Sequence, residues 1–277
     1  MKNIVLIIIW SLIFLSCDEP VRLDVNQGES RIIIEGQVTN AAGHQYVKVS
    51  SSNGFYESGK TPRVTNAIVS VSDDAGNDFP FVHNPGNLDD SAGYYLPQVP
   101  FIGEVGKTYF LTVAIDDQIY EAQDKLFSVT PIDSLSYRID EEEREDPEDP
   151  GKFYEVLIYA KEPQDTKDYY LFKFYRNDSL KLDFDTDIYF SDDEVLGESI
   201  DGVSSPIYFA PGDVARCEIF SISRTAFVFY SDLQSLLNSD GGLFSQPPAN
   251  SRTNLSNDAL GFFQASALHV SEIEIKE

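Results

Sequence analysis

Residues 31–39 read R-I-I-I-E-G-Q-V-T and open the folded part of the chain. β-Branched residues dominate this stretch, which predicts a β-strand. Similar strand signals recur at short spacing, at residues 46–50, 67–72, 79–82, 109–115 and 119–122. Turn residues separate them, as in D-D-Q at 116–118, which predicts a hairpin. Several short alternating strands divided by turns predict a β-sandwich, which we place at residues 30–128.

A second strand-rich body follows and is unusually aromatic. Residues 153–159 read F-Y-E-V-L-I-Y and residues 169–175 read Y-Y-L-F-K-F-Y. Aromatic residues are favoured in strands, so both stretches are predicted to be strands. Further strands are predicted at residues 180–190, 214–222, 261–270 and 273–275.

One segment of this second body has a helical period. Ala226, Phe229, Leu233 and Leu236 recur every three to four residues, which predicts a helix over 224–238. Ser223 is suited to cap its start, and Gly241-Gly242 to end it. The predicted fold class is therefore all-β with one helix, comprising the N-terminal β-sandwich and a C-terminal β-rich barrel or sandwich domain at 153–277.

The predicted joint between the two bodies spans residues 129–152 and is strongly acidic. Residues 140–149 read D-E-E-E-R-E-D-P-E-D. Like charges in such a run repel one another, so we expect an extended, solvated loop.

The N-terminal segment predicts export and anchoring. Lys2 precedes an apolar run at residues 4–15 that is about twelve residues long, against the ~20 that a spanning helix needs. We therefore interpret residues 1–16 as a signal peptide. The F-L-S-C segment ending at Cys17 resembles a bacterial lipobox, although Phe14 and Leu15 depart from its usual first two residues. Cys17 is thus the predicted lipidation site, and residues 17–29 the tether of a lipid-anchored protein.

Composition narrows the classes of partner. The chain has 46 acidic and 20 basic residues, a formal charge of −26. Such a surface repels nucleic acid, so no nucleic-acid partner is expected. With two cysteines and three histidines, the sequence offers no histidine-rich zinc site. Cys217 lies in a strand-like run and is interpreted as a small buried hydrophobe. His83, beside a turn, is expected at the surface.

One acidic pattern raises the question of calcium. Asp183, Asp185, Asp187 and Glu194 occupy places 1, 3, 5 and 12 of an EF-hand-like loop. Ile188, however, stands where glycine makes the sharp turn of that loop. The acids also alternate with apolar residues, which is typical of an amphipathic strand. We prefer the strand and keep calcium as the alternative, with no other cofactor expected.

The C-terminal region carries a family resemblance. Residues 247–265 read P-P-A-N-S-R-T-N-L-S-N-D-A-L-G-F-F-Q-A, with shorter echoes at 35–38, 106–111 and 131–135. These segments resemble the lipoprotein family catalogued as domain of unknown function 4249. Asn257-Asp258 replaces the glycine expected before Ala259. The resemblance implies an outer-membrane lipoprotein, often encoded beside a TonB-dependent receptor, with an immunoglobulin- or transthyretin-like N-terminal sandwich. It carries over no catalytic residue, and Asn254 and Gly261 are expected to be structural.

These observations lead to one expectation and two alternatives. We expect a non-enzymatic outer-membrane lipoprotein that assists a TonB-dependent uptake receptor or binds its ligand, and the sequence leaves open which side of the membrane it faces. The first alternative is an adhesion or glycan-binding module, for which Tyr94-Tyr95 and Tyr169-Tyr170 are candidate stacking residues. The second is a hydrolase, which is disfavoured because the sequence lacks the G-x-S-x-G and H-E-x-x-H motifs.

Overall fold

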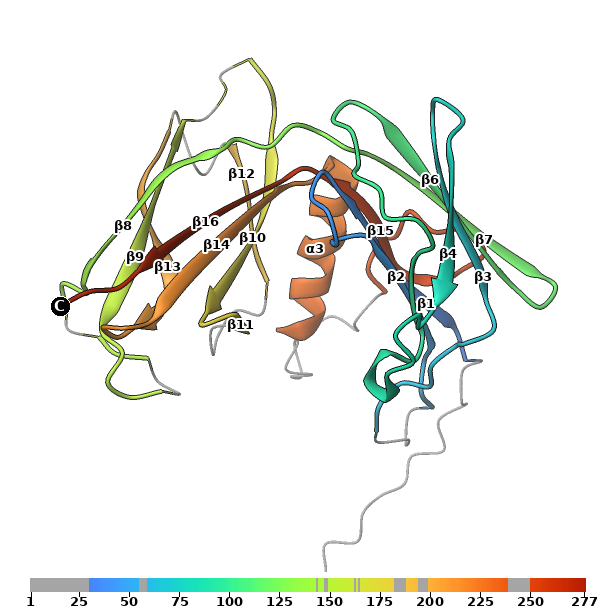
Figure 1. Cartoon of the computed structure of the whole chain (residues 1–277), viewed down its shortest axis with the longest axis horizontal. Coiled ribbons are helices and arrows are strands. Elements are labelled where there is room, and N and C mark those ends of the chain that lie inside the picture. The colour runs from blue at the N-terminus through green and yellow to red at the C-terminus, as the bar shows by residue number, and fades with distance from the viewer. Residues whose placement is uncertain are drawn as a thin grey trace, which may run out of the picture.

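The structure is a computed structural model, and it describes residues 30–54, 59–142, 144–146, 149–161, 163, 165–181, 188–193, 199–238 and 250–277. Within these residues the chain forms sixteen strands and one long helix, α3 (Arg224–Leu237). The all-β prediction with a single helix is confirmed. Figure 1 shows two β bodies side by side, with α3 lying between them.

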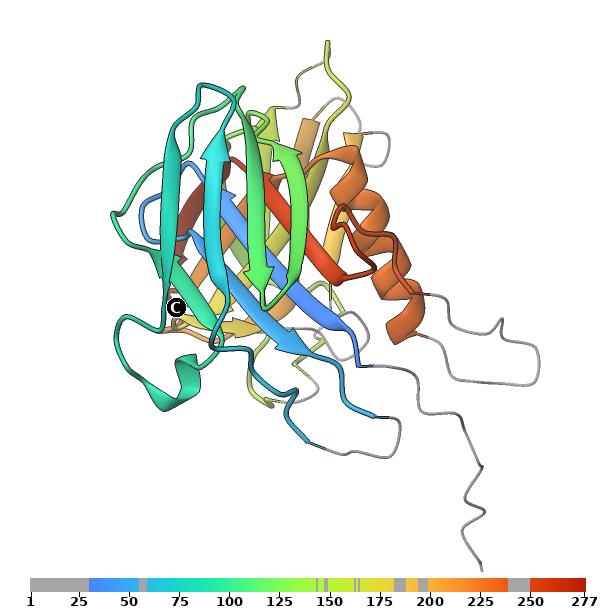
Figure 2. The same cartoon turned by 90° about the vertical axis from the view of Figure 1, so that its right-hand side faces the viewer.

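The first body is one eight-stranded sheet in the order β15-β1-β2-β5-β4-β3-β6-β7. Its elements are β1 (Ile32–Thr39), β2 (Tyr46–Ser51), β3 (Ile68–Asp73), β4 (Asp78–His83), the short 3-10 helix η1 (Asp89–Ser91), β5 (Tyr94–Pro97), β6 (Thr108–Ile115), β7 (Gln118–Lys125) and β15 (Leu260–Ser266). The predicted hairpin at 116–118 is present between β6 and β7. A bridge between Phe127 and Ser266 brings the two ends of the sheet together, so it curls almost closed instead of forming two facing sheets. Figure 2 shows its strands from the side.

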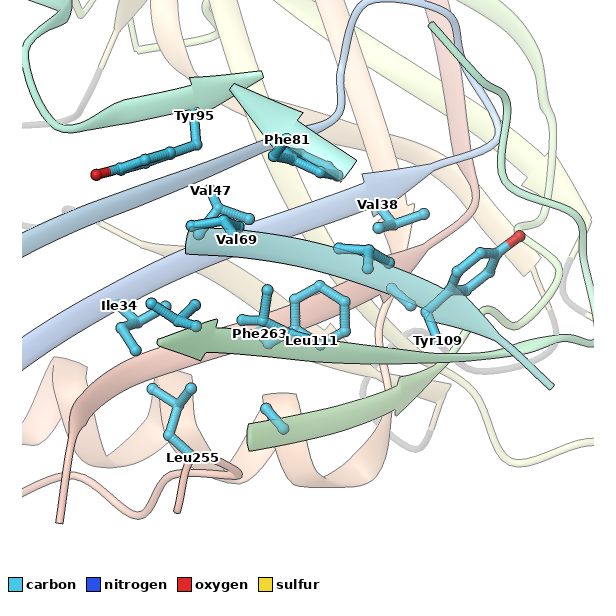
Figure 3. Packing of buried hydrophobic residues seen from close by; sticks show 14 of the residues in the cluster. Ile34, Val38, Val47, Val69, Phe81, Tyr95, Tyr109, Leu111, Leu255 and Phe263 are labelled. Carbon is cyan, nitrogen blue, oxygen red and sulfur yellow. The ribbon is translucent and has the colours of Figure 1, made fainter. Parts of the chain in front are cut away.

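The interior of this sheet is filled by apolar side chains (Figure 3). Along β1, Ile34 and Val38 point inward and are fully buried. Gly36 lies between them, where an added Cβ would come within 2.8 Å of the Phe263 ring. The large ring of Phe263 therefore fits because β1 carries no side chain at residue 36.

The second body combines two sheets around a second core. One sheet contains β11 (Ser179–Lys181), β10 (Tyr169–Arg176), β14 (Val214–Ser221) and β16 (Leu268–Glu274), with β12 (Tyr189–Asp192) also paired to β10. The other contains β13 (Ser199–Phe209), β9 (Tyr154–Lys161) and β8 (Ile132–Ile139). Residues of both sheets, among them Ile158, Phe174 and Ile219, share one apolar core.

The C-terminal segment belongs to both bodies, which differs from the predicted assignment of all residues after 153 to the second body. β15 pairs in parallel with β1 of the first sheet, and β16 then pairs with β14 of the second. The close pairing needs a glycine at residue 261. Gly261 has φ +97°, and a Cβ there would lie 2.1 Å from the carbonyl oxygen of Ile34.

The predicted acidic joint is more ordered than its charge suggested. β8 lies within it, and the prediction of a solvated run at 140–149 is wrong for two of its acids. Asp140 is buried and accepts hydrogen bonds from Arg144, which hold its pKa at about 2. Asp146 accepts from the buried Arg176 at 3.1 and 3.2 Å. A buried guanidinium needs a carboxylate partner, and this requirement outweighs the repulsion within the run.

Helix α3 confirms the helical prediction almost to the residue. The Ser223 hydroxyl accepts a hydrogen bond from the Ala226 N–H at 3.2 Å, as expected of an N-cap. The predicted Gly241-Gly242 ending lies outside the described residues. No helix in the described part of the chain has the length and apolar character needed to cross a membrane.

Candidate functional site

Most of the residues predicted to carry chemistry are not covered by the structure. Cys17, Asp183, Asp185, Asp187 and Glu194 all lie outside the described residues. The lipidation and calcium hypotheses therefore stay predictions. Elsewhere, across the described ranges, no group of three or more His, Cys, Asp or Glu side chains could hold a metal ion.

Two other singled-out residues have structural roles. Cys217 is buried, and burial raises the pKa of its thiol, as expected for a small core residue. His83, expected at the surface, is half-buried. Its Nε2 accepts a hydrogen bond from the Gly93 N–H at 3.0 Å, and its ring lies 5.2 Å from that of Tyr95. It therefore supports the turn that precedes β5.

The candidate sugar-stacking tyrosines mostly serve the core. Tyr95, Tyr169 and Tyr170 are buried, so their faces are not available to a glycan. Tyr94 is half-buried beside Tyr46, with the Lys48 ammonium 5.6 Å from its ring centre. The two motif residues Asn254 and Gly261 are structural as predicted, since the Asn254 side chain bonds to the backbone of Gln123 and Phe263.

The feature best suited to bind another molecule is a cleft of about 580 Å³ between the two bodies and α3. It arises because successive side chains of a strand point to opposite faces of the sheet. The inner faces of β1 and β15 fill the core of the first body, and their outer faces form one wall of this cleft. That wall carries Ile33, Glu35, Gln37, Leu260, Phe262 and Gln264.

The other two walls of the cleft are largely apolar. Helix α3 contributes Phe229, Tyr230, Leu233 and Leu236, which lie on one helical face. The second body contributes side chains of β10, β11, β12 and the residue before β12, namely Leu171, Phe172, Lys173, Leu180, Lys181, Ile188 and Tyr189. Small-molecule sites are typically concave, of about 300–1,000 Å³, and mostly apolar with a few polar groups, which describes this cleft.

One polar group of the cleft is already satisfied by its neighbours. The Tyr46 hydroxyl donates to Glu35 at 2.8 Å, and the Lys48 ammonium donates to the other oxygen of Glu35 at 3.0 Å. Burial, together with the adjacent Glu35 carboxylate, raises the pKa of Tyr46, so the phenol stays protonated. The Glu35 carboxylate is therefore engaged on both oxygens.

Lys173 is different because it reaches into the cleft from an otherwise aromatic strand. Its ammonium lies 4.8 Å from the centre of the Phe220 ring, a cation–π contact. Burial lowers its pKa, and the nearby Glu218 and Glu35 oppose that shift. Among the described residues, no ion pair joins Lys173 to a carboxylate.

Gln264 is the most buried polar group of the wall, with 4% of its surface exposed. Its Oε1 accepts a hydrogen bond from the Tyr230 hydroxyl at 2.7 Å. Its Nε2 is buried and has no hydrogen-bond partner within the described structure. The cleft thus has largely apolar walls, and two of its lining residues carry donors that stand out: the Lys173 ammonium, which forms no ion pair in the described structure, and the unpartnered Gln264 Nε2.

Sequence reasoning missed this cleft, although parts of it left a signal. The apolar face of α3 was predicted, but not what it faces. A lone lysine inside the aromatic run at 169–175 is also a departure from a plain core strand, and this residue, Lys173, lines the cleft together with Lys181.

The fold and the cleft define a class: an all-β protein of two bodies with an open, mainly apolar cleft between them. The chain belongs to the family described as Domain of unknown function (DUF4249), whose model matches residues 18–271. The resemblance drawn from the C-terminal motif is therefore confirmed over nearly the whole chain. No curated protein shows significant similarity to it.

Proposed function

We propose that this protein is an outer-membrane lipoprotein, anchored through Cys17, that binds a ligand without chemically changing it. In this proposal it acts as an accessory to a TonB-dependent uptake receptor and collects the molecule that the receptor imports. Anchoring at the outer membrane keeps the cleft close to such a receptor.

The observation that carries the proposal is the cleft of about 580 Å³ between the two bodies. Sites for small molecules occur preferentially between domains, where two surfaces supply opposite walls. Its apolar side chains would be costly to leave in water without a function, because contiguous exposed apolar surface is uncommon in soluble proteins.

Binding is favoured over hydrolysis by the chemistry of the cleft. A hydrolytic site needs a nucleophile with a base in hydrogen-bond reach. His44, His83 and His269 are absent from the described residues that line the cleft. The ring of His269 instead accepts the Ile132 N–H at 3.2 Å, where the two sheets of the second body meet.

The receptor partnership is tested by purifying the tagged lipoprotein from detergent-solubilised outer membrane and identifying co-eluting proteins by mass spectrometry. We expect a TonB-dependent receptor in comparable amount. The matched control is Cys17→Ala, which removes the predicted lipid anchor and should release the protein from the membrane fraction. Elution of the wild-type protein alone would contradict the accessory role. Binding to a polysaccharide array in that case would favour the glycan-binding alternative.

A further inference from the structure

The class of molecule that suits the cleft follows from its unsatisfied hydrogen-bonding groups. Buried polar atoms in proteins are nearly always hydrogen-bonded, and an orphaned one calls for an explanation. Gln264 Nε2 is such an atom, buried and without a partner within the described structure, on the wall of the cleft. Because the other amide atom is bound by Tyr230, the group left over is a donor, which requires an acceptor.

Lys173 supplies a second donor on the opposite wall. The two carboxylates that act on it are both engaged elsewhere. Glu35 is bound by Tyr46 and Lys48, whereas Glu218 accepts from Tyr175 at 3.1 Å and lies 3.6 Å from the Arg216 guanidinium. Lys173 is therefore a partly desolvated cation whose ammonium lies over the face of the Phe220 ring.

Both donors line the same cleft, together with Glu35 and Tyr230. Tyr230 in turn holds the Gln264 amide. The apolar residues Leu233 and Leu236 extend along α3 beyond Tyr230, so the cleft has a polar part and an apolar part.

We propose that the cleft binds a small amphiphile with a single carboxylate, whose oxygens accept from Lys173 and Gln264 while its apolar body lies against α3. This inference rests on the proposed ligand-binding function and names its substrate class. A carboxylate is an acceptor that matches two donors, and hydrogen bonds to charged groups are the stronger ones.

Charge selects a monoanion over the alternatives. A phosphate dianion would be repelled by Glu35 and Glu218, the two carboxylates that act electrostatically on Lys173. A cationic amphiphile would meet Lys173 directly, and the carboxylates that would attract it already have partners. A neutral alcohol would leave the charge of Lys173 without a counter-ion.

The test uses decanoate, with decanol and decylammonium as probes of equal chain length. Binding to the full-length lipoprotein in nanodiscs is measured by isothermal titration calorimetry, with empty nanodiscs subtracted. We expect decanoate to bind at least about tenfold more tightly than either other probe, and Lys173→Met to remove most of that preference. The matched control is Lys125→Met, because Lys125 also lies over a ring, 5.5 Å from the centre of Phe127, but does not line the cleft.

A second variant, Gln264→Leu, is expected to weaken decanoate while leaving decanol unchanged, and circular dichroism checks that each variant is folded. Equal binding of decanoate to wild type and Lys173→Met, or tighter binding of decanol, would overturn the carboxylate assignment and leave the cleft as a ligand site. Failure of all three probes to bind would overturn the assignment, whereas the receptor co-purification tests the accessory role separately.

Discussion

The two faces of β1 lie in different environments, one in a packed core and the other on a cleft. Ile34 and Val38 point into the first body and are fully buried, in a core with no room for a Cβ at Gly36. Ile33 and Glu35, one residue away along the strand, face a cleft of about 580 Å³. One strand therefore stabilises the fold with one face and forms a binding wall with the other. We expect substitutions on the inner face to change stability and those on the outer face to change binding.

The largest effect on stability is expected at Gly261, where β15 pairs closely with β1. Gly261→Ala should abolish folding, because its Cβ would lie 2.1 Å from the Ile34 carbonyl oxygen and block the pairing of β15 with β1. The matched control is Gly76→Ala. Gly76 also has a positive φ, +84°, but nothing lies within 4 Å of the added Cβ. The control should cost only about 1–3 kcal/mol of unfolding free energy, measured by denaturant titration. A folded Gly261→Ala protein with native stability would refute the close strand pairing.

The next effect is a cavity on the inner face. Phe263 is fully buried against Gly36, so Phe263→Ala should lower the unfolding free energy by about 3–5 kcal/mol. Urea denaturation measures this loss. A change below about 1 kcal/mol would mean that the first body is not packed as described.

A smaller, pH-dependent effect is expected at Asp124, which is buried where β7 meets β15. Burial raises its pKa to about 6, although the Ala265 N–H and the Ser223 hydroxyl donate to it. In the unfolded chain the carboxyl loses its proton near pH 4, so the folded protein binds the extra proton between about pH 4 and 6. Its ionisation therefore costs stability as pH rises through that window, and the cost is complete above about pH 6.

Asp124→Asn removes that cost while keeping a hydrogen-bond acceptor. Its gain in stability over wild type should be near zero at pH 4 and on the order of 2 kcal/mol at pH 7.5. Thermal unfolding at both pH values measures the difference. A gain in stability that is equal at the two pH values, or larger at pH 4, would show that burial does not raise the pKa of the Asp124 carboxyl.

The smallest effect on stability is expected on the wall of the cleft that α3 forms. Leu233 on α3 is half-buried and lines the cleft, so Leu233→Ala should lower the unfolding free energy by about 1 kcal/mol or less. The same variant should weaken decanoate binding, because the ligand loses apolar contact. A large loss of stability with unchanged binding would contradict the assignment of the α3 side chains to a ligand-binding wall.

Local patterns predicted much of the fold, and long-range pairing explains most of what they missed. The apolar spacing from Ala226 onward and the cap at Ser223 are local, and α3 was predicted nearly to its ends. The parallel pairing of β15 with β1 joins residues 33–39 to 260–266, and nothing within either strand specifies the other. That pairing is why β15 was predicted in the second body although it pairs with β1 of the first sheet.

The cleft could not be predicted from the sequence because it too depends on contacts between segments that are far apart in the chain. Its walls come from β1 and β15, from α3 and from β10, which meet only after both bodies have formed. The buried partners of the acidic run show a second limit. Charge density alone predicted a solvated loop, whereas Arg176 from a distant strand holds Asp146 in place.

A structure of the protein solved at saturating decanoate would test the binding role of the cleft most directly. We expect decanoate in the cleft between the two bodies, with its carboxylate within hydrogen-bond distance of Lys173 Nζ and Gln264 Nε2 and its chain along Leu233 and Leu236. Decanoate bound elsewhere, or an unoccupied cleft at saturation, would contradict the claim that the outer face of β1 is a binding wall.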